Sequence, residues 1–424
     1  MEAGPDRRRG VVLRAVALGL IASLVAACSG AAVGDSPPTT ATHRLAPPPP
    51  TASGLPPGVA TGPAGAAFYV PPSPLPSGRP GEVIWARPAP GTASARSYLV
   101  LYHSRSASGR DIAVSGQVWV PTTPYRGPGG GVPVLAYAHA TTGLGPQCAP
   151  SLGGSQEALM MGGPLLARGF VLTATDYEGL GVAGAPTYLV GASEAHTVLD
   201  SIRVARLLAG DARGPALVWG HSQGGGSALF AAELAPTYAP DDRVIGAVAG
   251  APVSELAYLW RTERHTTFFG FLMMMMTGLD AGYPDAGIRS LMTPLGIDAM
   301  RRAAGGCPSA VAYLSQVDPG KYVVVDPTSV PRVRAVLDAN SPGNVRTDVP
   351  MFVYQGDDDL IIPPGATRLM VERMCRAGGM AVQRRVYPGT DHISVIKAAT
   401  PDVYAFIDAR LAGRPAAPTA CPRS

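Results

Sequence analysis

Ser222 lies in the sequence Gly220-His-Ser-Gln-Gly224, and no other serine has a glycine both two residues before and two residues after it. The apolar run 216–219 predicts a strand before this serine, and 227–235 has helical character. A serine at such a turn stands in a nucleophile elbow, where the helix N-terminus stabilises negative charge. We predict that Ser222 is a nucleophile. In a chain with 52 glycines, a turn with an incidental serine is the alternative.

A serine nucleophile needs a base, and the base needs a carboxylate that orients it. Behind an elbow serine the acid comes next in the chain and the histidine last, which leaves His265 and His392 as candidates for the base. His265 closely follows two arginines, and we expect it to be an exposed helix residue. His392 directly follows the last predicted strand, 381–387, and precedes a helix. We therefore predict that His392 is the base.

Three adjacent aspartates, 357–359, follow the penultimate predicted strand, 351–355. Only Asp359 fits the spacing G-x-x-D-x-x-x-P, over residues 356–363, that the acid of an α/β-hydrolase usually shows. We assign Asp359 as the orienting acid and expect the two aspartates before it to cap the turn or to face water. Asp391 is the weaker candidate, because side chains adjacent in sequence tend to diverge.

The oxyanion that forms when a carbonyl is attacked needs two N–H donors. Elbow geometry makes the backbone N–H of Gln223 one donor, and the loop after the strand 132–137 should supply the other. That loop reads His139-Ala-Thr-Thr-Gly143, so we predict the N–H of Thr141, with Thr142 as the next candidate. Its alanine stands where glycine is usual, which leaves the backbone path open. We expect His139 to brace the loop by hydrogen bonding.

The elements that must position these groups alternate between strand and helix. Segments 98–102 and 112–120 predict an antiparallel pair. Helical stretches such as 193–208 separate the later strands, which we place at 132–137, 169–175, 216–219, 244–248, 351–355 and 381–387. This alternation predicts a mostly parallel sheet covered on both faces, with the site at the carboxyl ends of the strands. The predicted fold is α/β: an α/β-hydrolase with an inserted helical cap.

The cap is expected at about 252–330, where strand signals disappear and the sequence becomes helical and apolar. This segment includes the four consecutive methionines 273–276. Methionine is unbranched and adapts its shape, which suits the lining of a tunnel for acyl chains. A methionine-rich core of the cap, packed on itself, is the equal alternative.

The N-terminus has the composition of an export signal. Arginines at 7–9 and 14 accompany the apolar run 11–27, which is short for a membrane span, so we predict a signal peptide over 1–27. The run ends in Leu24-Val-Ala-Ala-Cys28, which resembles a bacterial lipobox. We expect a lipid on Cys28 to anchor the protein to a membrane, with ordinary cleavage as the alternative. Arg8-Arg9 also fits a loose twin-arginine pattern, so the export route stays open.

The rest of the chain divides by composition. Residues 28–66 form a Pro/Ala/Thr-rich linker with too little apolar surface to fold, 67–414 the catalytic domain, and 415–424 a C-terminal tail. We expect a protein of the cell envelope, lipid-anchored at the outer face of the membrane or secreted. Removing 1–27 takes away four arginines and two acidic residues, so the formal charge falls from +4 to +2. That balance gives no basis for binding nucleic acid.

Apart from Cys28, the chain has four cysteines: Cys148, Cys307, Cys375 and Cys421. An even number in an exported protein favours two disulfides over free thiols. Three pairings are possible, and spacing alone does not choose among them. No C-x-x-C spacing indicates a metal site, so we predict none.

These residues together resemble the secretory lipase family of capped α/β-hydrolases, over about residues 80–412. Besides the elbow, the 356–363 stretch and Asp391-His392, the likeness rests on His139-Ala-Thr-Thr-Gly143, Cys148-Ala-Pro-Ser151, Asp176-Tyr-Glu-Gly-Leu-Gly181 and Leu199-Asp-Ser-Ile-Arg203. The resemblance implies hydrolysis of carboxylic esters, of which acylglycerols are the expected substrates. It also implies sequential disulfides, Cys148 with Cys307 and Cys375 with Cys421, the first of which would tie the oxyanion loop to the cap.

The predicted mechanism is two-step acyl transfer without metal or organic cofactor, in which Ser222 attacks a lipid ester and water releases the fatty acid. One alternative is a cell-envelope acyltransferase, which product analysis with an added acceptor alcohol would distinguish. The other is a non-catalytic lipid-binding lipoprotein, which would not react with a fluorophosphonate probe.

Overall fold

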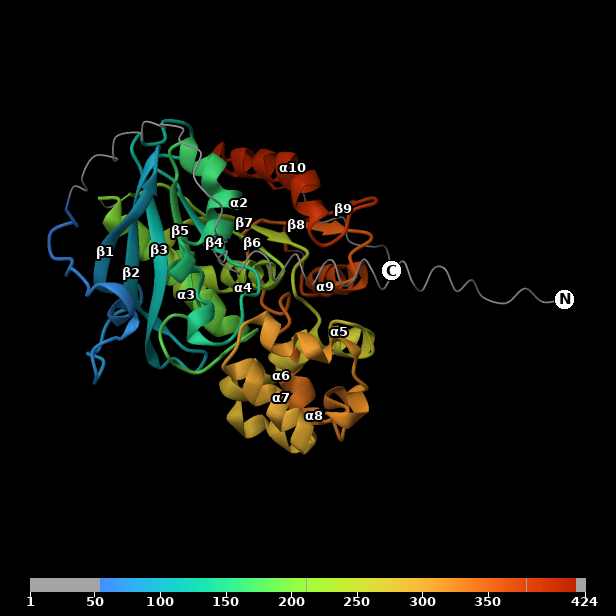
Figure 1. Ribbon diagram of the computed structural model, residues 1–424. Helices are drawn as coiled ribbons and strands as arrows, with labels where there is room; N and C mark the ends of the chain where they lie inside the picture. The colour runs from blue at the N-terminus through green and yellow to red at the C-terminus, as the bar shows by residue number, and fades with distance from the viewer. Residues whose placement is uncertain (1–53, 211, 379, 417–424) are drawn as a thin grey trace, which may run out of the picture.

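The computed structural model describes residues 54–416, apart from Asp211 and Gly379. Within these residues one nine-stranded sheet has the order β1-β2-β3-β5-β4-β6-β7-β8-β9 (Figure 1). The strands are β1 (Val83–Thr92), β2 (Ala95–Arg105), β3 (Asp111–Pro121), β4 (Val134–Ala138), β5 (Val171–Thr175), β6 (Ala216–His221), β7 (Val244–Gly250), β8 (Met351–Gly356) and β9 (Val382–Tyr387). The first three strands pair antiparallel, and from β5 to β9 in this order all neighbours are parallel. The predicted α/β class with a mostly parallel sheet is confirmed.

Helices cover both faces of the sheet because successive strand residues point to opposite sides. Along β4, residues 134, 136 and 138 pack in the cluster that includes α3 (Gly191–Leu208) and α4 (Gln223–Tyr238). Residues 135 and 137 pack in the cluster that includes α2 (Gln156–Ala167) and α10 (Ser394–Leu411). A strand buried on both faces reads as a continuous apolar run, which is why the central strands could be predicted.

The edge strand β1 was not predicted from the sequence. It contains Pro88 and Pro90, which have no N–H to donate to a neighbouring strand. Its strand partner in the sheet is β2 on one side only, and prolines are tolerated in such an edge position.

The predicted boundary between linker and catalytic domain at residue 66 is wrong for the described part of the linker. Leu55 and Val59 pack against the main core, and Thr61 forms a parallel bridge with Ala86 of β1. These two apolar side chains stabilise a segment that composition alone assigns to the linker, so the folded domain begins by about residue 55. The predicted signal peptide, 1–27, and Cys28 lie outside the described residues.

The chain between β7 and β8 forms a separate helical lobe, in yellow and orange in Figure 1. Its helices are α5 (Leu256–Glu263), α6 (Phe269–Gly282), α7 (Pro294–Ala304) and α8 (Pro331–Ala339), so it continues past the expected end at 330. The remaining helix, α9 (Pro364–Arg376), follows β8. The lobe packs in a second hydrophobic core, which also includes main-domain residues such as Leu144 and Val190 and to which all four methionines of 273–276 belong. Met275 also lines the pocket that contains Ser222, and the other three are not among the residues that line it, so the methionines serve mainly as core.

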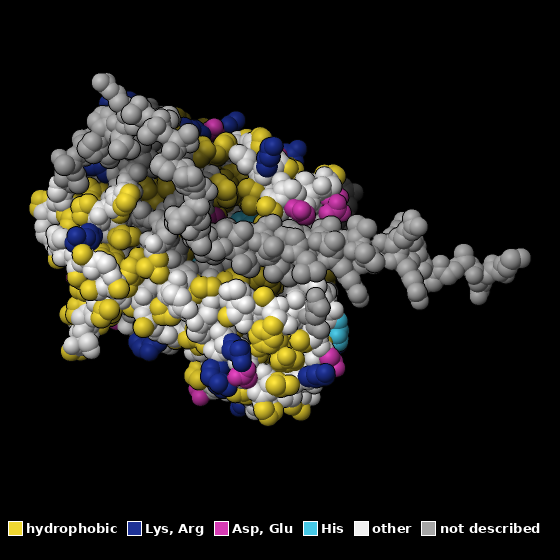
Figure 2. Space-filling view, in the orientation of Figure 1, with side chains coloured by type: hydrophobic (Ala, Val, Ile, Leu, Met, Phe, Trp, Pro, Cys, Tyr) yellow, Lys and Arg dark blue, Asp and Glu magenta, His cyan; other side chains and the backbone are white. Residues whose placement is uncertain are grey.

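The surface of this lobe carries charges of both signs. Figure 2 shows Lys and Arg side chains next to Asp and Glu side chains on it. Arg302 pairs with Asp298, and Arg289 pairs with Asp280. In the part of the chain that the structure describes, no helix has the length and apolar character to cross a membrane.

A disulfide joins this lobe to the main domain. Cys148 lies in the loop after β4, and its partner Cys307 lies just after α7. Beside it, the backbone N–H groups of Leu144 and Gly145 donate to the carbonyl oxygen of Gly306. The other predicted pairing, of Cys375 with Cys421, stays a prediction, because Cys421 lies outside the described residues.

The Cys148–Cys307 bond closes a loop of 159 residues, so removing it should increase the entropy of the unfolded chain. We expect the double variant Cys148→Ala, Cys307→Ala to lose about 2 to 5 kcal/mol of unfolding free energy in urea titrations. The single variant Cys307→Ala should lose a similar amount, since either change opens the same bond. An unchanged urea midpoint in both variants would contradict this expectation.

Candidate active site

Ser222 occupies a strained turn between β6 and α4, with φ 58° and ψ −120°. Two glycines make this turn possible. A Cβ atom on Gly220 would lie 2.1 Å from the carbonyl oxygen of Gly224, and one on Gly224 would lie 1.9 Å from that of Ala138. The N–H of Ser222 donates to the carbonyl oxygen of Gly250 at 2.8 Å, which holds the turn against β7.

His392 and Asp359 form a buried pair, with Nδ1 of the imidazole 2.7 Å from Oδ2 of the carboxylate. The carboxylate accepts three more hydrogen bonds. The backbone N–H groups of Ile361 and Ile362 donate to Oδ1 at 2.9 and 2.8 Å, and the side chain of Gln355 donates to Oδ2 at 3.0 Å. These donors fix the direction in which the carboxylate faces the imidazole.

The other candidates for acid and base lie elsewhere. Asp357 and Asp358 are exposed. Asp391 accepts hydrogen bonds from the backbone N–H groups of Ile393 and Ser394, just before and at the first residue of α10. His265 is exposed as expected, but it lies in the turn after α5 and not in a helix.

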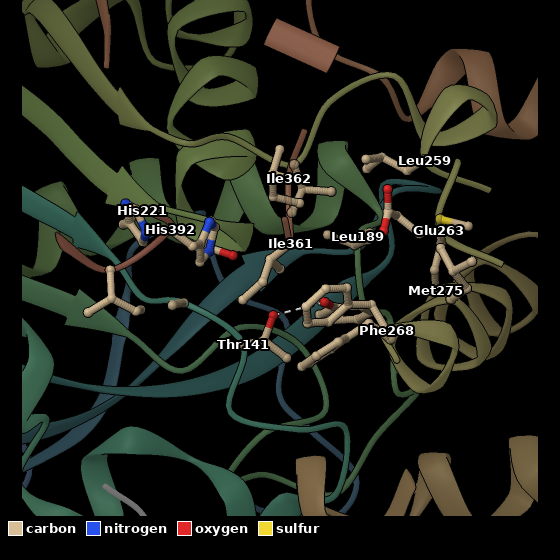
Figure 3. A pocket seen from close by; sticks show the side chains of 17 residues that line it. Thr141, Leu189, His221, Leu259, Glu263, Phe268, Met275, Ile361, Ile362 and His392 are labelled. Atoms are coloured by element: carbon tan, nitrogen blue, oxygen red, sulfur yellow. Dashed lines mark hydrogen bonds between the residues drawn. The ribbon is translucent and has the colours of Figure 1, made fainter. Parts of the chain in front are cut away.

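Ser222 and His392 line one pocket, which encloses about 730 Å³ of space that is partly open to solvent (Figure 3). Within the described residues no hydrogen bond joins the serine hydroxyl to the imidazole. Such bonds are often long in unliganded enzymes and shorten when substrate binds. Most of the remaining wall is apolar, and the cap contributes Leu259, Phe268, Phe271, Leu272 and Met275.

The predicted oxyanion donors flank the serine from two elements. Gln223 is the first residue of α4, so its N–H has no partner within the helix. Thr141 lines the pocket, and its hydroxyl lies 2.8 Å from that of Tyr188. Its backbone N–H donates to no group in the part of the chain that is described. Thr142 is not among the residues that line the pocket.

The loop that carries Thr141 is held from below by buried polar side chains. Glu157 on α2 accepts hydrogen bonds from the N–H of Ala140 at 3.1 Å and from the hydroxyl of Tyr137 at 2.7 Å. Nδ1 of His139 lies 2.6 Å from the carbonyl oxygen of Ala140, and burial lowers the pKa of His139 to about 4. A neutral imidazole therefore braces the loop, whose path does not need glycine at position 140.

Glu194 on α3 links the elbow to the opposite wall of the pocket. Its Oε1 accepts hydrogen bonds from the side chain of Gln223 at 2.7 Å and from the N–H of Leu189 at 2.9 Å. Its Oε2 accepts one from Ser227 at 2.5 Å. Leu189 lines the pocket with φ 58°, so this carboxyl holds a strained backbone in place. Burial raises the pKa of Glu194 to about 7.

Glu194 was not predicted from the sequence, although its position in the predicted helix indicates a buried carboxyl. Glu194 precedes Val198 and Ile202 by four and eight residues, so it falls on the apolar face of the predicted helix. A carboxyl on such a face needs buried donors. No sequence pattern pointed to Glu157 or Gln355. Glu157 lies in the first turn of α2, where acidic residues are common, and Gln355 lies at the end of β8 like many polar residues. No group of three His, Cys, Asp or Glu side chains in the described residues is arranged to hold a metal ion.

Comparison with known proteins gives a consistent picture. The model of a family described as "Secretory lipase" matches residues 153–419. A Mycobacterium tuberculosis protein described as "Probable inactive lipase MT1628" is 28% identical, over 82% of each chain. The "Probable trichothecene esterase SAT6" of Stachybotrys chartarum is 25% identical, over 76% of this chain and 71% of its own. Lipase A of Arthroderma benhamiae is 27% identical, over 73% of this chain and 72% of its own.

Among solved structures, lipase A of Candida antarctica in its closed state superposes with a TM-score of 0.72. It is 21% identical and is matched over 84% of this chain and 88% of its own. This likeness confirms the predicted α/β-hydrolase fold.

The elbow glycines provide a direct test of the turn geometry. Gly224→Ala should lose at least about 3 kcal/mol of unfolding free energy or fail to fold, because the new Cβ would overlap the carbonyl oxygen of Ala138. Gly153→Ala is the matched control, since a Cβ there meets nothing within 4 Å; it should be neutral or gain up to about 1 kcal/mol. Equal stability of the two variants in urea would show that the turn tolerates a side chain.

Glu194 makes stability depend on pH. In the folded protein its pKa is about 7 in place of 4.5, so the unfolded chain loses the proton first as pH rises through this window. Glu194 therefore does not lower the unfolding free energy below pH 4.5, and it lowers the unfolding free energy by about 3 kcal/mol above pH 7. Glu194→Gln should gain about 2 to 3 kcal/mol over the wild type between about pH 5 and about pH 8.

Urea unfolding at both pH values measures this difference. The exposed residue Glu82 is the control, because its pKa is lowered by hydrogen bonding to the backbone of Arg79. Glu82→Gln should therefore show no gain at high pH. If the unfolding free energy of Glu194→Gln changes with pH in the same way as that of the wild type, Glu194 does not have a raised pKa in the folded protein.

Proposed function

This chain belongs to the secretory lipase family and is a carboxylic ester hydrolase, and we propose that it cleaves esters of fatty acids with Ser222, His392 and Asp359 as catalytic triad. The observation that carries the proposal is the buried 2.7 Å contact between His392 and Asp359 at a pocket that also contains the elbow serine.

The chemistry follows from that contact. An aspartate that accepts from Nδ1 keeps the proton on this nitrogen, so Nε2 offers its lone pair to the serine hydroxyl. The serine oxygen attacks the ester carbonyl as His392 takes its proton, and the alkoxide leaving group receives that proton. Water, deprotonated by the same imidazole, then attacks the acyl-enzyme; the bond from the acyl carbon to the serine oxygen breaks, the imidazolium returns the proton to Ser222, and the fatty acid is released. The N–H groups of Gln223 and Thr141 stabilise the oxyanion in both steps.

The pocket wall supports a fatty-acyl substrate. Its cap side consists of aliphatic, aromatic and methionine side chains, which bind an acyl chain by the hydrophobic effect. The relatives described as lipases, from Arthroderma benhamiae and Candida albicans, agree with this substrate class. Export fits the description of the family as secretory, and lipid anchoring through Cys28 is part of the proposal.

One relative is described as a probable inactive lipase, so a non-catalytic lipid-binding protein is the alternative to be tested. An intact triad distinguishes the two. The proposed triad residues are all present in this chain, and the contact between His392 and Asp359 supports the catalytic alternative.

Ser222→Ala should reduce kcat/KM for p-nitrophenyl esters by at least about 10³-fold and leave the melting temperature unchanged. Asp359→Asn should also lose at least about 10³-fold, because the imidazole loses its preferred tautomer. Asp358→Asn is the matched control: this neighbouring carboxylate is exposed, and its removal should leave the rate unchanged. If Ser222→Ala turns over normally, or if the wild type does not react with a fluorophosphonate, the protein is not a serine hydrolase of this design.

A further inference from the structure

The apolar pocket contains one carboxyl group that the proposed reaction does not use. Glu263 is the last residue of α5, is only 6% exposed and lines the pocket. In Figure 3 it lies beside Leu259 and Met275, on the side of the pocket away from His392. It therefore faces the distal part of any chain whose ester carbonyl is at the serine.

The protein itself gives this carboxyl little stabilisation. Its hydrogen bonds come from two neighbouring threonines: the hydroxyl of Thr266 lies 3.2 Å from Oε2, and a side-chain hydrogen bond from Thr262 also lowers its pKa. No Lys or Arg in the described residues pairs with it; the adjacent Arg264 pairs with Asp326. A negative charge at the C-terminal end of a helix is also unfavourable. Burial and the charge of Asp359 both raise the pKa of Glu263.

A buried polar group without adequate partners costs stability, so a partner supplied by the ligand would explain its position. A hydroxyl group suits a carboxyl in either protonation state, because it donates to a carboxylate and accepts from a carboxylic acid. A protonated amine would have to lose all its water among apolar side chains, which costs far more.

We propose that Glu263 recognises a hydroxyl group on the acyl chain of the substrate, so that the enzyme prefers hydroxyacyl esters to unsubstituted esters of the same length. This inference rests on the proposed ester hydrolysis at Ser222. Glu263 takes no part in bond making or breaking, and its contribution is to specificity.

The test compares p-nitrophenyl esters with and without a terminal hydroxyl, over acyl chains from butanoyl to dodecanoyl. At the chain length that reaches Glu263, the wild type should favour the hydroxyacyl ester by about 10- to 100-fold in kcat/KM, the range expected for a hydrogen bond to a charged group. Glu263→Leu should reverse this preference, and Glu263→Gln should keep most of it, because an amide still bonds to a hydroxyl. Thr266→Val is the control: it removes one internal partner and should leave the preference in place.

Melting temperatures close to that of the wild type show that each variant is folded. A wild type without hydroxyl preference at any length overturns the inference, as does an unchanged preference in Glu263→Leu. A stronger preference for a terminal amine that disappears in Glu263→Gln overturns it in favour of a cationic substrate. Loss of all activity in Ser222→Ala alongside any of these results leaves the proposed function standing, whereas full activity in Ser222→Ala removes both.

Discussion

The close approach of α4 to the end of β4 is the constraint on which the site depends. The carbonyl oxygen of Ala138 lies where a Cβ on Gly224 would be, so only glycine lets the helix come this near. Residue 139 follows directly, which brings the oxyanion loop next to the elbow serine. The turn at Ser222, two residues before Gly224, has a strained backbone conformation. This backbone contact keeps the segments that carry the two predicted oxyanion donors, Gln223 and Thr141, close to each other.

Buried carboxyl groups hold the loops that surround this contact. Asp176 accepts hydrogen bonds from the hydroxyl of Ser115 and from both the N–H and the hydroxyl of Ser151. Two sequence segments that are far apart, 148–151 and 176–181, are thus parts of one hydrogen-bonded cluster. Glu157 and Glu194 act in the same way under the oxyanion loop and the elbow. Each carboxyl exchanges hydration for several donors, which fixes loop positions at the carboxyl ends of the strands.

The sequence was sufficient for features with a local cause. Apolar runs located the central strands, the glycine spacing located the turn at Ser222, and the 356–363 spacing selected Asp359 from three adjacent aspartates. The structure brings Asp359 and His392 together across 33 positions, as expected.

Features that depend on long-range packing were not accessible in this way. The partner of Gln223 is a glutamate on another helix, and nothing near either residue indicates the pairing. The edge strand β1 was not predicted because it contains two prolines. The start of the folded domain was placed too late because the residues around Leu55 have the composition of a linker. From the sequence, the four methionines could equally line a tunnel or form the core of the cap. Their burial depends on how the cap helices pack, and the cluster that contains them extends to Leu337.

The Cys148–Cys307 bond joins the loop after β4, which also carries Thr141, to the cap near the end of α7. This covalent bond sets an upper limit on the separation of the two segments, so the cap cannot move away from this loop while the bond is intact. Cap residues that line the pocket away from this bond, such as Phe268 and Phe271, carry no such covalent restraint.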